Sequence, residues 1–252
     1  MKRLSVIGLP VAATDYREAV DWALERAAAK DRAYAVEAAN THVAALARHD
    51  REFGKSMGRF DLILPDGMPL IWAINDQLGR DFKLKERVYG PTLMLKCMEA
   101  TAKRPDIGHF LLGGSQSTLE KLEAFFSNKF PSTNIAGSYS PPYGQWDIAE
   151  QERIEEKIRQ SGASLIWVGL GCPKQEHWMA RHLDRLPEGV YFGVGAAFAF
   201  HAGDVPQAPS FLQKSGLEWL YRLAMEPRRL LRRYVVFNSL FIFFWLRDRM
   251  DP

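Results

Sequence analysis

Short apolar runs alternate with longer helical patterns along most of this chain, and this alternation constrains the fold more than any other feature. The predicted strands cover residues 34–39, 61–64, 108–112, 132–136, 165–169 and 190–194. The predicted helices cover residues 16–29, 41–49, 68–78, 91–103, 115–129, 148–160, 174–183 and 210–249, with a break at Pro227 in the last. Strand–helix alternation at this spacing predicts an α/β fold of Rossmann-like type, with a largely parallel sheet flanked by helices.

Polar or glycine-rich residues follow the predicted strands. Parallel sheets bind ligands beyond the carboxyl ends of their strands, so we expect the functional residues there. The segments at these positions are Asn40-Thr41-His42, Asp66-Gly67, Gly113-Gly114, Gly169-Leu170-Gly171 and Gly195-Ala196.

Two of these turns suit an anion. Gly113 and Gly114 open a helix, and glycines let a backbone approach a ligand closely, although an ordinary strand–helix turn explains them equally well. The turn at Gly171 is more informative, because Pro173 stands where a helix begins and Lys174 lies in its first turn. A cation at the positive end of a helix indicates an anionic ligand such as a diphosphate, whereas the alternative is an exposed Lys at an ordinary helix start.

Asp66 and Asn40 each allow two interpretations. Asp66 directly precedes a helical pattern and could be its N-cap, or it could act as a general base at the sheet edge. Asn40 could cap the next helix or bind a sugar hydroxyl. His42 is expected at the surface or behind the site, because no Cys or carboxylate spacing makes it a metal ligand.

The C-terminal segment carries the charge of the chain. Residues 216–252 hold seven Arg, no Lys and four acidic residues, which is a net charge of +3, and the rest of the chain sums to zero. The following apolar run, residues 234–246, is too short to span a bilayer. The pattern predicts a helix on an anionic membrane, with Phe237, Phe241, Phe244 and Trp245 buried in the lipid. The alternative is a terminal helix packed on the core with solvated Arg.

Composition excludes several other classes. The charge outside the C-terminal segment is too balanced for nucleic acid binding, and the two cysteines form no disulfide or metal framework. The N-terminal apolar stretch is too short for a signal peptide. No Asp-x-Asp pair, Walker loop or G-x-S-x-G elbow is present, so we expect no metal and no cofactor.

A set of motifs resembles the WecG/TagA/CpsF family of bacterial glycosyltransferases over nearly the whole chain. The matching segments are Asn40, Pro65-Asp66-Gly67, Leu112-Gly113-Gly114, Gly169 to Glu176, Gly193 to Ala196, Ala202-Gly203, Gly216 to Arg222 and Glu226 to Arg229. The resemblance implies an inverting transferase that moves a sugar from a UDP-sugar to a polyprenyl-diphosphate-linked saccharide. Such enzymes make exopolysaccharide, teichoic acid or common-antigen polymers at the inner face of the cytoplasmic membrane, without a metal.

The resemblance also implies roles for single residues. It makes Asp66 the catalytic base, with Asn40 beside it, and it brings Arg222, Arg229 and Arg232 to the diphosphate. The substrate-binding residues expected from the turns and the resemblance are Thr41, Gly67, Gly113, Gly114, Tyr143, Gly171, Pro173, Lys174, Gln175, Glu176 and Gly195. Two departures, Ala38 for a Thr and Ala199 for an Asp, leave the donor open among N-acetylmannosamine, its uronic acid, glucose and glucuronic acid.

The Pro- and Gly-rich stretch at residues 203–209 predicts a boundary between a catalytic domain, residues 1–205, and a helical, membrane-associating appendage, residues 206–252. The resemblance implies that this appendage closes over the active site. The oligomeric state stays open, a homo-oligomer included. Two rival functions remain: a non-catalytic, membrane-bound subunit that binds a sugar nucleotide or lipid diphosphate, with Asp66 as a cap, and a hydrolase, which the missing Ser elbow disfavours.

Overall fold

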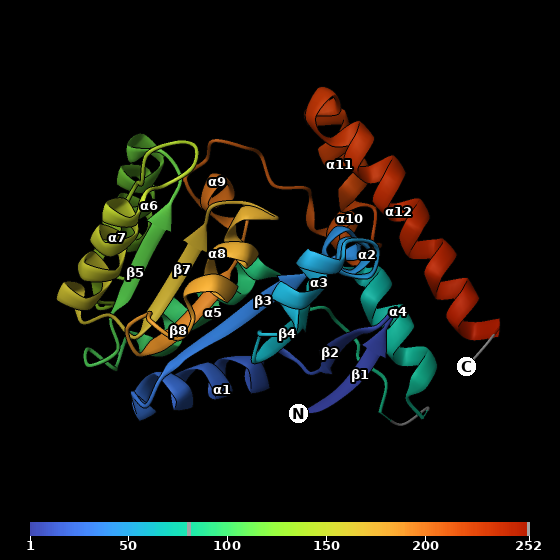
Figure 1. The fold of residues 1–252 in the computed structure, drawn as a ribbon, viewed down its shortest axis with the longest axis horizontal. Helices are drawn as coiled ribbons and strands as arrows, with labels where there is room; N and C mark the ends of the chain where they lie inside the picture. The colour runs from blue at the N-terminus through green and yellow to red at the C-terminus, as the bar shows by residue number, and fades with distance from the viewer. Residues whose placement is uncertain (80–81, 251–252) are drawn as a thin grey trace. The chain divides into compact units, whose positions relative to one another are not determined.

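The computed structural model describes residues 1–79 and 82–250, and the chain forms two compact units (Figure 1). Unit 1 consists of Met1–Asp15, Ala38–Tyr89 and Gln207–Pro252. Unit 2 consists of Tyr16–Glu37 and Gly90–Pro206. The segment from Gln207 onward therefore belongs to the same compact unit as the N-terminal residues. The predicted domain boundary at residues 205/206 stays a prediction.

A six-stranded sheet has the strand order β4-β3-β8-β7-β5-β6. Its strands are β3 (Ala33–Ala39), β4 (Leu62–Pro65), β5 (His109–Gly113), β6 (Ile135–Tyr139), β7 (Leu165–Gly169) and β8 (Gly189–Gly193). Strands β3, β8, β7, β5 and β6 pair in parallel. Strands β5, β7 and β8 are buried along almost their whole length, which explains their continuous apolar sequences, whereas the edge strand β6 is half-buried throughout.

Helices flank the sheet in unit 2, as the alternation predicts. They are α1 (Tyr16–Ala29), α5 (Gly90–Thr101), α6 (Gln116–Lys129), α7 (Ile148–Ser161), α8 (Lys174–His182) and α9 (Ala197–His201). In the core, Trp167 of β7 stacks on Phe192 of β8 with ring centroids 4.4 Å apart. The indole nitrogen of Trp167 donates to Nδ1 of the buried His109, 3.0 Å away, so these two buried polar groups satisfy each other.

Unit 1 begins with a β-hairpin that the alternation does not predict. Strands β1 (Lys2–Val6) and β2 (Leu9–Ala13) pair in antiparallel register, with Val6 opposite Leu9. The two linking residues, Ile7 and Gly8, have φ values of 48° and 89°. Two positive φ values in a two-residue loop favour Asn-Gly or Asp-Gly, and a β-branched Ile there is rare, so the sequence carries no strong hairpin signal.

The remaining elements of unit 1 are helical. They are α2 (Thr41–His49), α3 (Arg51–Met57), α4 (Met68–Gln77), α10 (Ser210–Lys214), α11 (Glu218–Met225) and α12 (Pro227–Met250). The predicted C-terminal helix is thus three helices rather than two, because Gly216 takes a φ of 76° between α10 and α11 and Pro227 starts α12. Helices α3 and α9 are short additions, and strand β6 begins three residues later than predicted.

Helix α12 packs against α2, and this overturns the assignment of Phe237, Phe241 and Trp245 to a membrane, whereas that of Phe244 stays a prediction. Phe241 is 1% exposed inside unit 1, and Phe237 contacts the ring of His42, with centroids 4.5 Å apart. The ring of Trp245 lies beside that of Phe241. Because a residue four or seven positions away lies on the same face of a helix, these three aromatics form one protein-facing stripe.

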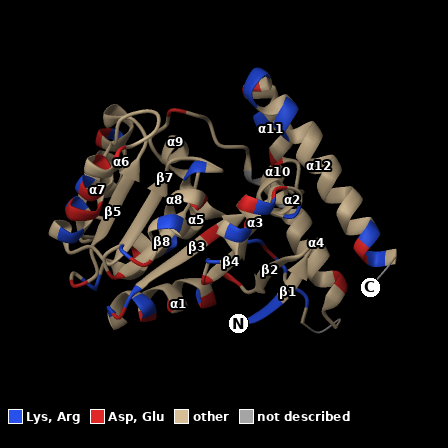
Figure 2. Cartoon of the chain, viewed as in Figure 1, with Lys and Arg blue, Asp and Glu red and all other residues tan. Residues whose placement is uncertain are grey.

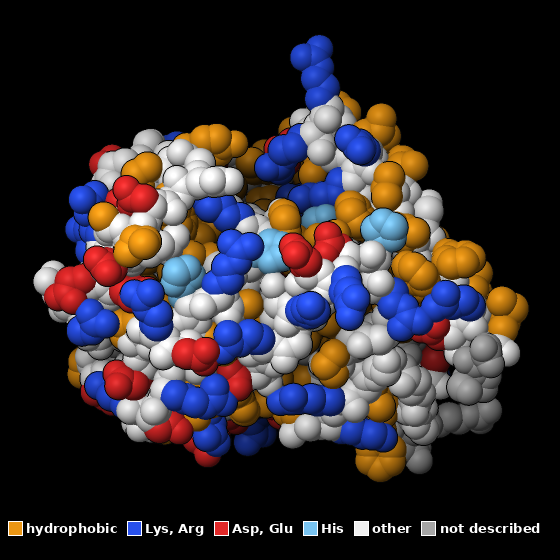
Figure 3. All heavy atoms as spheres, in the orientation of Figure 1, with side chains coloured by type: hydrophobic (Ala, Val, Ile, Leu, Met, Phe, Trp, Pro, Cys, Tyr) orange, Lys and Arg blue, Asp and Glu red, His pale blue; other side chains and the backbone are white. Residues whose placement is uncertain are grey.

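A different face of α12 is apolar and exposed. Val236, Phe243 and Leu246 are exposed, and Figure 3 shows hydrophobic side chains gathered along the edge where Figure 1 places this helix. Arg residues gather at both ends of α12 and leave its middle uncharged (Figure 2). Among the helices of residues 1–79 and 82–250, none combines the length and apolar character that crossing a bilayer requires.

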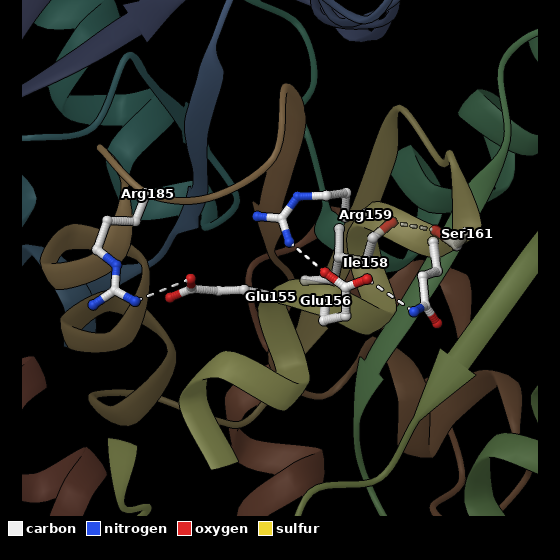
Figure 4. A network of polar contacts seen from close by, with 7 residues as sticks. Glu155, Glu156, Ile158, Arg159, Ser161 and Arg185 are labelled. Atoms are coloured by element: carbon white, nitrogen blue, oxygen red, sulfur yellow. Dashed lines mark hydrogen bonds and ion pairs between the residues drawn. The ribbon is translucent and has the colours of Figure 1, made fainter. Parts of the chain in front are cut away.

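The charged face of α7 is accounted for by local ion pairs (Figure 4). Glu156 pairs with Arg159 at 2.6 Å, and Glu155 pairs with Arg185 at 3.3 Å. The Glu156–Arg159 pair is exposed at both ends and contributes little stability, whereas Glu155 is buried and Arg185 reaches it from the surface.

Candidate active site

A cavity of about 730 Å³ lies in unit 1, at the N-terminal ends of α2 and α4. Its size is ordinary for a ligand pocket, and most of its wall is apolar. The residues that line it are Asn40, Thr41, His42, Asp66, Gly67, Met68, Pro69, Trp72, Arg87, Tyr89, Ser215, Gly216, Leu217, Glu218, Trp219, Arg222, Leu223, Arg233, Tyr234, Val235, Asn238, Ser239, Phe241, Ile242 and Trp245. Asp66, Asn40, Thr41, Gly67 and Arg222, which the sequence singles out, thus lie at one cavity.

Asp66 follows β4, and its backbone N–H donates to the Ala39 carbonyl at the end of β3, 2.8 Å away. The N-cap of α4 is Gly67, so Asp66 lies one residue before the cap position. This argues against the helix-cap interpretation of Asp66. Its half-buried carboxylate lines the cavity instead, where a general base would have to stand.

Asn40 does cap a helix. Its Oδ1 accepts from the backbone N–H groups of His42 and Val43, at 3.0 and 3.3 Å. Only the amide nitrogen of Asn40 is therefore left to donate to a ligand in the cavity. Thr41 has a structural partner too, because its Oγ1 donates to Oδ1 of Asn238, 2.7 Å away, which ties α12 to the start of α2.

A buried ion pair stands beside Asp66 in the cavity lining. Arg87 pairs with Glu218, and their side chains are only 12% and 9% exposed. The hydroxyl of Tyr89 donates to the other oxygen of Glu218, 2.7 Å away. Burial alone would lower the pKa of Arg87, but the carboxylates of Asp66 and Glu218 outweigh it and raise that pKa. Arg87 therefore stays charged next to the proposed base.

Sequence reasoning missed Arg87 and Glu218, because neither stands in a recognised turn and 131 residues separate them. Glu218 could have been found from its place in the Gly216 to Arg222 motif. Arg87 gave no signal beyond its charge.

The arginines of the C-terminal segment divide into two groups. In the described residues, the cavity lining includes Arg222 and Arg233 but neither Arg229 nor Arg232. Arg229 is exposed and pairs with Glu226 at 2.6 Å, and Arg232 is exposed. Nε of Arg233 is buried, and within residues 1–79 and 82–250 no hydrogen-bond partner meets it. Arg233, which the sequence did not single out, is thus a cation with an unused donor at the cavity.

His42 lines the cavity and is neutral at physiological pH. Burial, and to a lesser degree the charge of Arg233, lowers its pKa from 6.5 to about 4. Of the two positions expected for His42, the surface is therefore wrong and a position at the site holds, since His42 is 8% exposed. Its ring supports the aromatic stripe of α12.

In unit 2, parallel pairing brings the turns after β5, β7 and β8 to one edge of the sheet. A Cβ on Gly113 would overlap the backbone of Gly169, and one on Gly169 would overlap the ring of Phe198. These glycines are therefore explained by packing. Gly171 and Gly195 have φ values of 80° and 49°, and the space around their Cα atoms is open, which leaves room for a ligand.

The start of α8 departs from the simple anion site. Nζ of Lys174 donates to the Gly144 carbonyl, 2.9 Å away, and lies 3.9 Å from the centroid of the Trp146 ring. Lys174 thus fixes the loop that carries Tyr143, whose side chain is fully exposed. The N-cap Pro173 offers no capping side chain, and in the first turn of α8 the Gln175 N–H donates to the Gly171 carbonyl instead, 3.0 Å away. Gln175 and Glu176 are buried rather than exposed to a ligand.

The model of the glycosyl transferase WecG/TagA/CpsF family matches residues 4–252. The chain belongs to this family. A curated relative from Bacillus spizizenii, named N-acetylglucosaminyldiphosphoundecaprenol N-acetyl-beta-D-mannosaminyltransferase, is 29% identical over 192 residues, which cover 76% of this chain and 71% of the relative. As a WecG/TagA/CpsF protein, the chain is a glycosyltransferase. The cavity at Asp66 is the candidate site of unit 1, and the open glycine turns are the candidate ligand site of unit 2.

Proposed function

We propose that this protein transfers a sugar from a UDP-sugar to a saccharide on a polyprenyl diphosphate during cell-surface polymer synthesis. One observation carries the proposal: besides the Arg87–Glu218 ion pair, the cavity combines the carboxylate of Asp66, the arginines Arg222 and Arg233 and a mainly apolar wall. An acceptor with a hydroxyl, a diphosphate and a hydrocarbon chain requires these three kinds of surface. The printed name of the Bacillus relative describes an acceptor of this chemistry, a sugar diphosphate on undecaprenol.

The proposed reaction is a single displacement with inversion. Asp66 takes the proton of the acceptor hydroxyl while its oxygen attacks the anomeric carbon of the donor, and the bond to UDP breaks. The negative charge that develops on UDP needs fixed donors. Each component is supported by geometry on its own unit: Asp66 in the cavity of unit 1, and the turns at Gly171 and Gly195 in unit 2 for the nucleotide.

We assign the acceptor to the cavity. Arginine suits a diphosphate because its planar donors can bind two oxygens at once, and Arg222 and Arg233 both line the wall. Trp72, Trp219 and Trp245 belong to the same wall and suit the first isoprene units. Arg229 and Arg232, which the resemblance brings to the diphosphate, lie outside the described lining of this cavity, so we assign the diphosphate to Arg222 and Arg233 instead.

A panel experiment tests the activity. The protein is incubated with UDP-sugars and short-chain prenyl-diphosphate N-acetylglucosamine, and UDP release and the lipid product are measured by mass spectrometry. We expect turnover with one donor, and its persistence in excess EDTA, since the sequence lacks an Asp-x-Asp pair. Saturable binding without any transfer across the panel would favour the rival function, a non-catalytic binding subunit.

Arg233→Ala should raise the KM for the prenyl-diphosphate acceptor by roughly 10- to 100-fold, because hydrogen bonds to charged groups contribute about 1.5–3 kcal/mol. The matched control is Arg228→Ala, which removes an exposed Arg from the first turn of α12 without altering the described cavity lining. Steady-state kinetics with varied acceptor separates the two. Equal effects of the two substitutions would show that surface charge, not a contact in the cavity, governs acceptor binding.

We further propose that the protein attaches to the cytoplasmic face of the membrane through the exposed face of α12. Replacing Val236, Phe243 and Leu246 by Ser should release the protein from anionic vesicles in a sedimentation assay, since fully burying such side chains contributes about 1.5–3 kcal/mol each. Ile148→Ser, at an exposed apolar residue of unit 2, is the control and should leave binding unchanged. Undiminished vesicle binding by the triple variant would contradict this face as the attachment site.

Deleting the whole segment from Gln207 is a poor test of attachment. Leu230 and Phe241 are buried in unit 1, so their loss would damage its core.

A further inference from the structure

Two buried carboxyl groups meet in unit 2. Glu37 lies on β3 and is 2% exposed, and Glu176 lies in the first turn of α8 and is 0% exposed. Their side chains are within hydrogen-bonding reach of each other. The side chains of Cys172 and Gln175 also hydrogen-bond the Glu176 carboxyl. Neither of them carries a positive charge, and nor does Glu37. Two like charges are costly to bury side by side.

At position 193, the packing around this carboxyl pair leaves room only for a glycine. Gly193 of β8 is paired in register with Glu37. A Cβ on Gly193 would overlap Oε2 of Glu37 and would stand 2.9 Å from Nε2 of Gln175. Gly193 lies outside the glycines with positive φ, so its role here is to leave space. The fold thus accommodates the carboxyl pair closely.

Gln175 connects the pair to the Gly171 turn. Its Nε2 donates to Oε1 of Glu176, 3.2 Å away, and its Oε1 accepts from the Gly171 backbone N–H, 3.1 Å away. The backbone N–H of Gln175 donates to the Gly171 carbonyl at 3.0 Å. Gln175 therefore holds both sides of a turn whose open space we assign to the nucleotide.

We propose that Glu37 and Glu176 share one proton, and that this carboxylic acid–carboxylate pair, acting through Gln175, holds the Gly171 turn in its ligand-ready form. With one proton, one carboxyl donates to the other, as in other closely spaced acid pairs. Without it, the two carboxylates repel, so Glu176 shifts away from Glu37 and Gln175, whose Nε2 donates to Glu176, shifts with it. Gln175, Glu176 and Glu37 are then positioning residues rather than ligands of the substrate.

The charge environment supports the shared proton. Burial raises the pKa of Glu176 from 4.5 to about 7, and the hydrogen bonds from its own backbone and from Cys172, Glu37 and Gln175 offset that only in part. The titratable groups that face it are Glu37 from β3 and the Cys172 thiol from the turn before α8, whereas β8 presents Gly193. Because the folded-state pKa is raised, the protonated pair stabilises the fold fully below pH 4.5, and this stabilisation is lost as the pH rises through about 7.

The first experiment needs no activity. The full-length protein is labelled with ¹⁵N-glycine, and the Gly171 amide resonance, assigned through Gly171→Ala, is followed from pH 5 to 9. We expect it to titrate in the wild type and in Glu156→Gln, which changes an exposed carboxylate of α7. In Glu176→Gln the chemical shift of the Gly171 amide should not change with pH, because the carboxamide donates to Glu37 at every pH. A Gly171 resonance that is flat in the wild type, or that titrates in Glu176→Gln as in the wild type, overturns the proposal.

Stability gives an independent readout. The urea midpoint of the wild type should fall between pH 5 and 8, and Glu176→Gln should flatten that dependence. If Glu176→Gln does not fold, Glu37→Gln replaces it, because a shared proton requires either substitution to abolish the titration. An unchanged pH dependence in the substituted protein contradicts the pair.

The functional role rests on the proposed nucleotide site, so it is measured separately. Wild-type transfer should fall about tenfold on the alkaline side as the pair loses its proton, and Glu176→Gln should shift that decline to higher pH. If Gly171 titrates as expected and the transfer profile does not follow, the proton-sharing pair stands and the assignment of the nucleotide to this turn is wrong.

Discussion

Asp66→Asn should reduce transfer by about two to four orders of magnitude, which is the usual contribution of a positioned general base. Asn has nearly the same shape as Asp but cannot take the proton of an acceptor hydroxyl. Because Gly67 caps α4, the substitution leaves that helix start intact. Acceptor KM should change little, so the loss should appear in kcat.

Asp50→Asn is the matched control. Asp50 caps α3 in the same unit, with its Oδ1 accepting from the backbone N–H groups of Glu52 and Phe53. Asn is an equally good cap, so stability and transfer should stay at wild-type levels. Near-normal turnover in folded Asp66→Asn would remove Asp66 from the role of base and favour the non-catalytic alternative.

Arg87→Ala should destabilise the protein by about 3–5 kcal/mol, because it leaves the buried carboxylate of Glu218 without its cation. Urea unfolding monitored by circular dichroism should show a lower midpoint at similar slope. The control is Arg104→Ala, whose ion pair with Asp106 is largely exposed and should contribute at most about 1 kcal/mol.

A double variant separates stability from activity at this position. Arg87→Met combined with Glu218→Gln removes both charges, keeps a partner for the Tyr89 hydroxyl and should recover most of the lost stability. The rate of sugar transfer by the double variant should be below that of the wild type, because Arg87 no longer stands beside Asp66. Full recovery of transfer in the double variant would show that the pair only supports the fold.

The sheet and most helices were predictable from the sequence, because buried parallel strands such as β7 carry continuous apolar runs and helices such as α2 begin with a capping residue. The hairpin β1–β2 was not, since Ile7-Gly8 lacks the residues that usually take positive φ. The function of the apolar run in α12 was ambiguous for another reason. It is apolar on two faces, and only the packing shows that Phe241 faces the protein while Phe243 is exposed.

For the site residues too, local sequence order was predictable and tertiary contacts were not. Residues directly after strands, such as Asp66, could be placed from the order of elements alone. The partners that bring their charge from distant segments could not, because the pairing of Arg87 with Glu218 exists only after folding. The rotation of α12 about its axis decides which of its arginines faces the cavity. Arg233 lines the cavity and its neighbour Arg232 does not, although the two are adjacent in the sequence.

The composition of unit 1 has a consequence for biosynthesis. Its residues come from Met1–Asp15, Ala38–Tyr89 and Gln207–Pro252, whereas every residue of unit 2 precedes Gln207. During translation, unit 2 can therefore assemble while the early segments of unit 1 still wait for α11 and α12. Since Glu218 and Arg233 line the cavity, a ribosome-bound chain shorter than this has no complete pocket. Prematurely terminated chains should thus be inactive and should expose the α2 surface that α12 normally covers to chaperones and proteases.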